Sequence, residues 1–351
     1  MRKKSSNKLI WPKVSVIIPV YNREWCIGEC LRSIQKQDYP IQKIEVVLVD
    51  ARSTDRTLEI AKSFQGKKGP LDLRVITIKD PLAQKIGEPG KVVGYKKMTG
   101  EFYFYLDSDA EFVSRTFVKD LIFPLLDDPQ IAGSFTRYLP SKKQNAFNRY
   151  VSYNELQLWP LLAYLVPKIG EVTVEKRKKY DVVKINPAKS PPIGMAFFRK
   201  KFLDRVITNT SKFNYVDIAI PLQLAELGYD QFAFVKKAGM HHFRAGIKRE
   251  FWRQKRDVTI TYLPVVGERK FKYVDFGNPL DLLKIIGWVL WVNLLIPSFI
   301  VGIYKTIKYK DWAGLYELPT NFILTNYIIY LFITDPKGRQ LISNVILGRK
   351  I

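Results

Sequence analysis

The stretch Tyr103-Phe104-Tyr105-Leu106-Asp107-Ser108-Asp109-Ala110 joins an apolar, aromatic run directly to two carboxylates that are one residue apart. We interpret the run as a buried strand and the acidic pair as the turn at its carboxyl end, where open α/β sheets bind ligands. Carboxylate oxygens suit Mg²⁺ or Mn²⁺, and such ions share their coordination with substrate phosphates. Because Asp-Ser-Asp is also ordinary turn chemistry, the stretch alone leaves a metal clamp and a surface turn open.

Alternating strands and helices are predicted ahead of this stretch. Short apolar runs bounded by turn residues indicate buried strands, and apolar residues at helical spacing indicate helices. The predicted strands are 14–19, 44–49 and 73–78, and the predicted helices are 24–37, Ser53 to Phe64, and 90–99. This alternation predicts an α/β fold with a mostly parallel sheet flanked by helices.

Three motifs follow one another in the first half of the chain. They are Val14-Ser-Val-Ile-Ile-Pro-Val-Tyr-Asn22, then Val49-Asp50 with Ser53-Thr54-Asp55, then Gly94, Gly100-Glu101 and Leu106-Asp107-Ser108-Asp109. Their order and spacing resemble the family 2 glycosyltransferases of the GT-A fold, over roughly residues 12–260. The resemblance implies a Rossmann-like α/β domain, a UDP- or GDP-linked sugar donor, Mn²⁺ or Mg²⁺, and transfer with inversion at the anomeric carbon.

The resemblance also assigns donor-binding residues. It puts Tyr21 and Asn22 against the donor base, Asp50 on an N–H of that base, and Lys91 near the diphosphate. A turn or helix-cap role is the alternative for Asp50, and a solvated surface lysine is the alternative for Lys91. The full expected donor-binding set is Pro19, Tyr21, Asn22, Asp50, Lys91, Asp107, Ser108, Arg244 and Arg253. Because the chain has Asp50-Ala51-Arg52 where the family usually has Asp-Asp-Gly, the donor base stays unidentified.

A metal site is expected around the acidic pair. Similarity favours Asp109 as a direct ligand of the ion and Asp107 as a contact to the ribose, the ion or its bound water. The only two histidines of the chain, His241 and His242, are adjacent, and relatives can place a ligand in this region. Neighbouring side chains of an extended backbone point to opposite faces, so we expect one histidine to reach the ion. We favour His242, with His241 as the alternative and a turn-supporting pair as the other interpretation.

The second half of the chain is expected to supply the acceptor site and a general base. Residues 216–229 predict a helix that stops at Gly228, and an acidic residue begins the corresponding helix in the family. Asp217 matches it and would accept the proton of an acceptor hydroxyl. A charge favoured by the helix macrodipole is the alternative. Should Asp217 not be the base, the remaining candidates are Asp204, Glu226 and Asp230.

The chain is strongly basic, with 57 Lys plus Arg against 33 Asp plus Glu and a formal net charge of +24. This charge indicates anionic partners such as nucleotide-sugars, lipid phosphates or a membrane surface. No zinc-finger, helix-turn-helix or RNA-binding signature accompanies it, so we do not expect nucleic acid. Residues 236–257 predict a basic amphipathic helix that closes over the diphosphate, lies on lipid headgroups or simply faces solvent.

The two cysteines, Cys26 and Cys30, lie four residues apart on a predicted helix, where a mutual disulfide is unfavourable. We interpret them as packing residues in a reducing compartment. The basic segment 1–12 lacks the apolar core of a secretory signal. We therefore expect the catalytic part to be cytoplasmic.

Two uncharged stretches near the C-terminus have the composition of membrane segments. Residues 285–304 form an uncharged run of 20 residues, and residues 318–334 form one of 17. The first run matches the roughly 20 residues that span a bilayer core. The connector between the two runs is basic, and basic loops favour the cytoplasmic side of a membrane. A shallow hairpin near the cytoplasmic face therefore competes with two full crossings. We expect a transmembrane or membrane-embedded hairpin over 279–335. Ordinary core helices are the alternative, as they are for the apolar segment 156–166.

The predicted organisation is a catalytic domain over 13–265 with membrane-associated helices after it and a basic tail at 336–351. The catalytic domain divides into a nucleotide-binding half, 13–138, and an acceptor half, 139–265. We expect an inverting, metal-dependent glycosyltransferase at the cytoplasmic face of the cell membrane, acting on a lipid-linked glycan or on polyprenyl phosphate. The alternatives are a non-catalytic membrane-bound nucleotide or polyanion binder and a sugar-1-phosphate nucleotidyltransferase, although residues 19–25 lack the Gly-rich signature of the latter.

Overall fold

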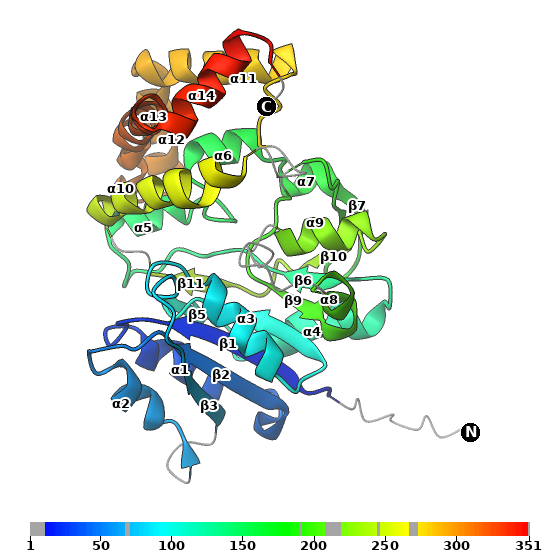
Figure 1. The fold of residues 1–351 in the computed structure, drawn as a ribbon. Coiled ribbons are helices and arrows are strands. Elements are labelled where there is room, and N and C mark those ends of the chain that lie inside the picture. The colour runs from blue at the N-terminus through cyan, green and yellow to red at the C-terminus, as the bar shows by residue number, and fades with distance from the viewer. Residues whose placement is uncertain are drawn as a thin grey trace. The chain divides into compact units, whose positions relative to one another are not determined.

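The computed structural model describes residues 11–66, 71–189, 191–207, 219–243, 246–266 and 273–349 (Figure 1). The chain divides into two compact units. Unit 1 combines Met1–Arg137, Thr173–Ile185 and Ile193–Met240, and unit 2 combines Tyr138–Val172, Asn186–Pro192 and His241–Ile351. Each unit therefore draws on segments that lie far apart in the sequence.

Unit 1 contains a nine-stranded mixed sheet in the order β3-β2-β1-β4-β9-β6-β10-β8-β7. Because only β9 and β8 pair antiparallel to both of their neighbours, the other strands of this sheet run in one direction. The strands are β1 Val14–Val20, β2 Ile44–Asp50, β3 Asp72–Thr77, β4 Phe102–Tyr105, β6 Gly133–Phe135, β7 Thr173–Lys176, β8 Asp181–Lys184, β9 Ala196–Arg199 and β10 Gln231–Phe234. The predicted mostly parallel α/β fold is confirmed, and the antiparallel insertion of β9 was not foreseen.

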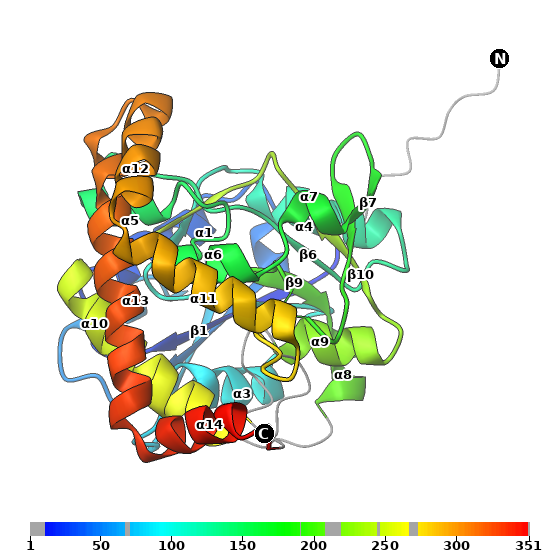
Figure 2. The same ribbon diagram turned by 90° about the horizontal axis from the view of Figure 1, so that it is seen from above.

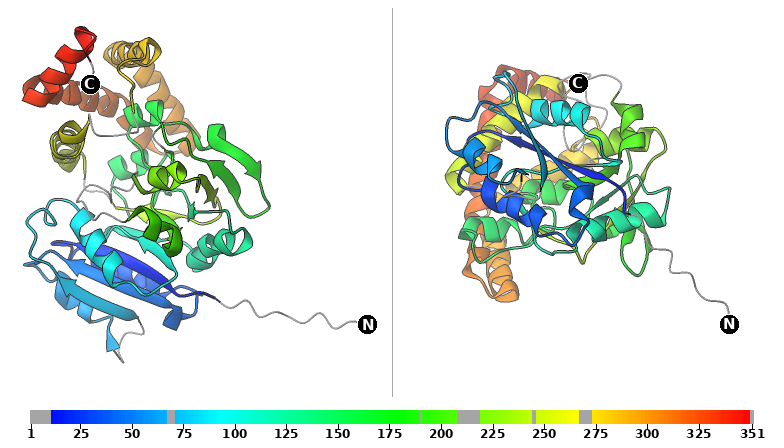
Figure 3. Two further views of the ribbon diagram at one scale, coloured as in Figure 1. Left: turned by 45° about the vertical axis from the view of Figure 1, so that its right-hand side comes forward. Right: turned by 90° about the horizontal axis from the view of Figure 1, so that it is seen from below.

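Six helices accompany the sheet in the described part of unit 1 (Figure 3). They are α1 Ile27–Gln35, α2 Thr57–Lys62, α3 Glu88–Lys97, α4 Phe117–Asp127, α8 Lys200–Val206 and α9 Ala219–Glu226. α3 packs against β1 at two glycines: a Cβ on Gly90 would lie 2.9 Å from Cβ of Pro19, and one on Gly94 would collide with Ile17. This close approach holds the N-terminal half of α3 beside the end of β1.

The core of the sheet is apolar on both faces. Every residue of β2 and β4 is buried, as continuous hydrophobic runs predict for covered parallel strands. Phe104 is the centre of an aromatic cluster, with its ring centroid 4.5 Å from that of Phe197. Cys26 and Cys30 are buried free thiols, as predicted. Burial raises the pKa of the Cys30 thiol well above its ordinary value, so this side chain acts as a neutral packing group.

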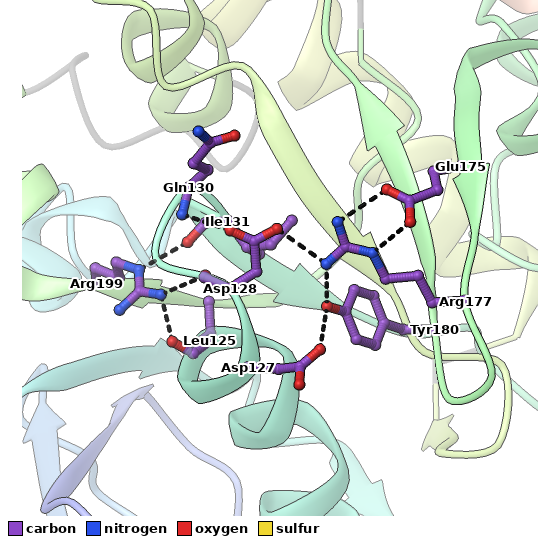
Figure 4. Close-up of polar contacts among 9 residues, drawn as sticks. All are labelled: Leu125, Asp127, Asp128, Gln130, Ile131, Glu175, Arg177, Tyr180 and Arg199. Carbon is purple, nitrogen blue, oxygen red and sulfur yellow. Dashed lines mark hydrogen bonds and ion pairs between the residues drawn. The ribbon is translucent and has the colours of Figure 1, made fainter.

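The β7–β8 hairpin is tied to the end of α4 through Arg177, which donates to Asp128 at 2.9 Å and to both carboxylate oxygens of Glu175 (Figure 4). Tyr180 also donates to Asp127 at 2.8 Å. Burial opposes the charge of Asp128, yet the N–H of Gln130 and the Arg177 guanidinium hold its pKa below the ordinary value. These bonds fix an insertion that has no counterpart among the predicted elements.

Unit 2 is mainly helical. It contains α5 Ala146–Val151, α6 Pro160–Leu165, α7 Ile169–Val172, α10 Ile247–Arg256, α11 Pro279–Asn293, α12 Ile296–Tyr309, α13 Glu317–Thr334 and α14 Pro336–Ile346. A π-helical turn, Asp257–Tyr262, follows α10, and a short 3₁₀ helix, Trp312–Tyr316, joins α12 to α13. Within this unit, helices α11 to α14 lie together on one side of α6 and α10, and α13 contacts both (Figures 1 and 2).

The predicted membrane segment 285–304 is not one helix. α11 ends at Asn293, Leu295 has a φ of 62°, and α12 starts with Pro297 in its first turn. Among the described residues no single helix has the length and apolarity of a membrane span; α11 and α12 reach that composition only as a pair, and their axes bend by 77°. The break falls where Leu295 has left-handed backbone and where proline cannot donate the backbone hydrogen bond that would continue the helix.

Candidate functional site

Three polar loops follow neighbouring strands of unit 1. Since β2, β1 and β4 are parallel, the loops after them lie at one edge of the sheet. Asn22, which has a φ of 50°, links two of these loops: its Oδ1 accepts from the N–H of Thr54 at 2.9 Å, and its own N–H donates to Ser53 Oγ. The motif residues after β1 and β2 thus form one bonded structure beside Tyr21.

Asp50 is fully buried at the end of β2. Its carboxylate accepts from the backbone N–H groups of Arg52 at 2.9 Å and Ser53 at 3.1 Å. These bonds shape a loop in which Arg52 has a φ of 64°. The structure therefore gives Asp50 the turn-forming role, and its contact to a donor base stays a prediction.

Lys91 is a buried lysine of α3. Its side chain is 5% exposed, its Nζ lies 3.6 Å from Glu88 Oε1, and the same atom sits 3.9 Å from the ring centroid of Tyr105. The alternative of a solvated surface lysine is wrong, because the side chain is buried against the ring of Tyr105. A buried ammonium at the edge where the strands end is suited to a diphosphate.

The acidic pair lies between β4 and a short strand, β5 Ala110–Phe112, which pairs with β11 Met240–His242 in a separate two-stranded sheet. The boundary between the two units falls inside β11, after Met240. One ligand atom each from Asp107, Asp109 and His242 lies within 4.8 Å of the others. The pairing of β5 with β11 thus gathers the three predicted ligands, and Ser108 between the aspartates is buried.

The two histidines have different environments. Nδ1 of His241 lies 2.9 Å from the carbonyl oxygen of Leu139, whereas Nδ1 of His242 lies 2.9 Å from Oε1 of Gln157. An amide oxygen accepts only, so Nδ1 of His242 donates to Gln157, and an ion would bind through Nε2. Of the pair, only His242 belongs to the acidic cluster in the described part of the chain. Ion binding by these residues stays a prediction.

Gln157 is a site residue that the sequence interpretation missed. It is almost fully buried, it has a φ of 50°, and its Nε2 donates to Ser152 Oγ at 2.7 Å. The buried side chain of Gln144 donates to the carbonyl oxygen of His242 at 2.9 Å. Left-handed backbone at a non-glycine residue is strained and persists where the surroundings enforce it. Nothing in the local sequence marks this glutamine, because its partners are 5 and 85 residues away.

The remaining predicted site residues fall into two groups. Asp217 and Arg244 lie outside the described residues. Arg253 is in α10 of unit 2, where its guanidinium lies 3.0 Å from Glu250. Two alternative bases are already engaged: Asp204 accepts from Lys200 at 2.8 Å and from Tyr95, and Asp230 lies 3.3 Å from Lys184. Glu226 is exposed near the end of α9.

The side chains of the acidic cluster suit a hard divalent cation. Two carboxylates and an imidazole provide oxygen and nitrogen ligands of the kind that Mn²⁺ accepts, and the cluster lacks the thiolates that select softer ions. Gln157 orients the imidazole from its far side, as second partners of liganding histidines do. The residues present therefore fit a Mn²⁺ or Mg²⁺ ion.

Comparison with known proteins agrees with this arrangement. The family model for glycosyl transferase family 2 matches residues 15–206. The chain is 42% identical over 110 residues to the poly(ribitol-phosphate) beta-N-acetylglucosaminyltransferase TarS of Staphylococcus aureus, a match that covers 31% of this chain and 18% of that protein. It is 30% identical over 129 residues to the dolichyl N-acetyl-alpha-D-glucosaminyl phosphate 3-beta-D-2,3-diacetamido-2,3-dideoxy-beta-D-glucuronosyltransferase of Methanococcus voltae, covering 34% of this chain and 37% of that enzyme.

A solved structure shares the fold. The mannosyltransferase PcManGT from Pyrobaculum calidifontis, in complex with GDP-Man and Mn²⁺, superposes with a TM-score of 0.51 at 18% identity, covering 97% of this chain and 81% of that one. The two sequence matches reported above cover less than half of the length of each curated relative. These sequence matches support the family, and the structural match supports the fold.

Proposed function

Because this chain belongs to glycosyl transferase family 2, we propose that it is an inverting glycosyltransferase that passes a sugar from a nucleotide-sugar to a lipid-linked acceptor. One observation carries the proposal. Asp107, Asp109 and His242 form a cluster suited to a divalent cation, and the buried Lys91 packs over Tyr105, two residues before Asp107. A metal–diphosphate clamp needs this combination of anionic ligands and a nearby cation.

We assign the ion to Asp109 and His242, with Asp107 bound to it directly or through water. When bound, a Mn²⁺ or Mg²⁺ ion would stabilise the negative charge of the leaving diphosphate. The ammonium of Lys91 would offset part of the same charge. UDP and GDP both stay open as the donor nucleotide, because Asp50-Ala51-Arg52 departs from the usual family motif.

Transfer with inversion is a single displacement. An acceptor oxygen forms a bond to the anomeric carbon while the bond from that carbon to the diphosphate oxygen breaks, and the electron pair leaves with the diphosphate. The hydroxyl proton of the acceptor moves to a carboxylate, for which we retain Asp217. If the acceptor is an ionised phosphate, no such base is needed. Asp217→Asn should therefore lower the turnover with a hydroxyl acceptor and leave the turnover with a phosphate acceptor nearly unchanged.

The acceptor is proposed from the relatives and the composition. One relative is named for poly(ribitol-phosphate) and another for a dolichyl-linked phosphate sugar, so an anionic or lipid-carried glycan is the favoured class, with polyprenyl phosphate as the alternative. A net charge of +24 favours such acceptors. We place the reaction at the cytoplasmic face of the cell membrane.

The test is a thermal-shift panel of UDP-, GDP- and dTDP-linked sugars with the full chain, each with and without Mn²⁺. We expect one nucleotide to raise Tm in the presence of the ion, because ligands that bind the folded state stabilise it. Asp109→Ala should abolish this metal-dependent shift while the protein stays folded. Asp72→Asn, which alters an exposed carboxylate of β3, is the matched control.

Two results would contradict the proposal. An unchanged donor shift in Asp109→Ala would remove the clamp. A donor that binds but is neither transferred nor hydrolysed with any lipid-linked or polymeric acceptor would favour the alternative of a non-catalytic nucleotide binder.

A further inference from the structure

Helices α11, α12 and α13 of unit 2 share buried polar contacts beside apolar ones such as Val292 and Leu324. Glu317 is 4% exposed, and its carboxylate accepts from Lys305 at 2.5 Å and from Tyr150 at 2.8 Å. Asn321 donates to Ser298 at 3.2 Å in the same interior. Trp288 of α11 donates to Thr325 of α13 at 3.1 Å, again between buried side chains.

The small residues of α12 complete this polar interior. Gly302 is buried, and a Cβ on it would lie 3.2 Å from the carbonyl oxygen of Gly314. Ser298, Gly302 and the partly buried Thr306 follow one another at four-residue spacing, so they form the inward face of the helix. Small and hydroxyl residues at a tight helix contact are typical of helices packed in an apolar medium.

The outward faces of α11 and α12 are apolar. Ile296 and Ile307 are 68% and 72% exposed, more than most apolar side chains of the described chain. The residues of this surface, which we call the α11–α12 apolar face, are Leu283, Ile286, Leu290, Leu294, Ile296, Phe299, Ile300, Ile303 and Ile307. Many exposed apolar side chains with buried polar side chains behind them depart from the arrangement that water favours.

The dimensions of these helices argue against a full crossing. α11 has 15 residues and α12 has 14, so each is about 21–23 Å long, against roughly 30 Å for the hydrocarbon core of a bilayer. The bend of 77° between them prevents the pair from acting as one straight span. A bent pair of this length can enter one leaflet and return.

Charged and aromatic side chains lie where the apolar face ends. Lys308 and Lys310 are exposed at the end of α12, and the Nζ of Lys308 lies 5.3 Å from the ring centroid of Tyr309. Trp312, 59% exposed, follows in the next turn. Lysines attract anionic headgroups, and tyrosine and tryptophan favour the depth at which apolar and wet surroundings meet.

We propose that the α11–α12 apolar face inserts into one leaflet of an anionic lipid bilayer as a wedge, without crossing it. A bilayer is the binding partner favoured by the exposed apolar side chains, by the length and bend of α11 and α12, and by the lysines at the end of α12. The lipid surface would then bring the chain to the lipid-linked acceptor of the proposed function. Membrane binding itself needs neither donor nor metal, so it can be tested apart from sugar transfer.

The first experiment measures binding of the full chain to vesicles by flotation without detergent. We expect binding to phosphatidylglycerol vesicles and at least tenfold weaker binding to phosphatidylcholine vesicles. The double variant Leu290→Glu/Ile300→Glu should lose at least tenfold in binding to the anionic vesicles. The matched control Val174→Glu/Leu227→Glu adds the same charges at exposed apolar positions of unit 1 and should bind as the parent does.

Two outcomes of this experiment would overturn the proposal. One is vesicle binding that the Leu290→Glu/Ile300→Glu variant keeps. The other is a parent chain that ignores vesicles but forms dimers which this variant dissociates in analytical ultracentrifugation, since the occupant would then be a second copy. A folded far-UV circular dichroism spectrum of each variant keeps the comparison valid.

The second experiment separates a wedge from a crossing. Single cysteines at Lys284→Cys on α11 and Lys308→Cys on α12 would be labelled with a membrane-impermeant maleimide in sealed inverted membrane vesicles. The native Cys26 and Cys30 are buried and provide the background. A wedge makes both new thiols react from the cytoplasmic side. Protection of Lys308→Cys until the vesicles are opened would show a crossing and refute the wedge.

Discussion

The sheet of unit 1 buries almost only apolar side chains, whereas helices α11–α13 of unit 2 bury polar side chains beside apolar ones such as Val292 and Leu324. β2 and β4 bury only apolar positions apart from Glu45 and Asp50, whereas α12 and α13 bury Ser298, Glu317 and Asn321 and expose isoleucines. The difference teaches that unit 1 is stabilised mainly by removing apolar surface from water, while α11–α13 add internal polar bonds and keep many apolar side chains exposed.

The largest expected effect is in the sheet. Phe104 is fully buried against Phe197 and Phe117, so Phe104→Ala should lower the free energy of unfolding by about 3–5 kcal/mol. The same change at Phe299, which is 49% exposed on α12, should cost less than about 1 kcal/mol in detergent-free buffer. Urea unfolding followed by circular dichroism measures both, and similar losses would break the comparison.

The interior of the helical layer provides the second test. Glu317→Leu leaves Lys305 without its carboxylate, and we expect a loss of about 1–3 kcal/mol, below the 3–5 typical of fully buried pairs, because Lys305 keeps 28% exposure. Adding Lys305→Met should restore most of the stability, since an apolar pair of similar volume replaces the ion pair. If the double variant is no more stable than Glu317→Leu, the unpaired charge of Lys305 is not the cause of the lost stability.

Gln157 is a buried polar residue of unit 2 whose contact to His242 gives it an expected role in metal binding. Gln157→Leu removes the acceptor for Nδ1 of His242 and should weaken Mn²⁺ binding by about 10–100-fold, the usual effect of losing such a partner. Isothermal titration calorimetry of Mn²⁺ alone is the measurement. Gln65→Leu, which removes a side-chain bond to Leu73 in unit 1, is the control. Equal Mn²⁺ affinities in the parent and Gln157→Leu would assign the glutamine to packing only.

The smallest effect is expected from the Arg177 network. The pKa of Asp128 is lowered in the folded state, so its pairing contributes stability above the unfolded pKa of about 4 and loses it as the pH falls below that value. Arg177→Leu should therefore lower the free energy of unfolding by less than about 1 kcal/mol at pH 7. We expect the Tm difference between the parent and this variant to be measurable at pH 7 and to shrink towards pH 3. A difference that grows on acidification would contradict this assignment.

Much of unit 1 was predictable because its signals are local. Apolar runs and turn residues located β1, β2, β3 and β4 within about two residues at each end, and the stop at Gly228 appears as a φ of 86° with Tyr229 N–H bonded to the Leu224 carbonyl. The antiparallel strand β9 was not predictable as a neighbour of β4, because pairing partners 95 residues apart leave no periodic trace.

The candidate site divides in the same way. Asp107, Asp109 and His242 were recognised from motif and residue type, but their gathering depends on the pairing of β5 with β11. Lys91 was predicted near the diphosphate with a surface lysine as the alternative, and only the structure shows that it is buried against Tyr105. The contact between Gln157 and Nδ1 of His242 could not be predicted from the sequence at all.

The sequence by itself determined the alternation of strands and helices, the family motifs, the acidic pair and the uncharged C-terminal stretches. These depend on side-chain periodicity and local chemistry, which each segment carries alone. The tertiary structure decided which of the two histidines joins the acidic pair, that Lys91 is buried, and that residues 285–304 bend instead of forming one helix. Such outcomes depend on contacts between distant segments, and only the folded chain brings those together.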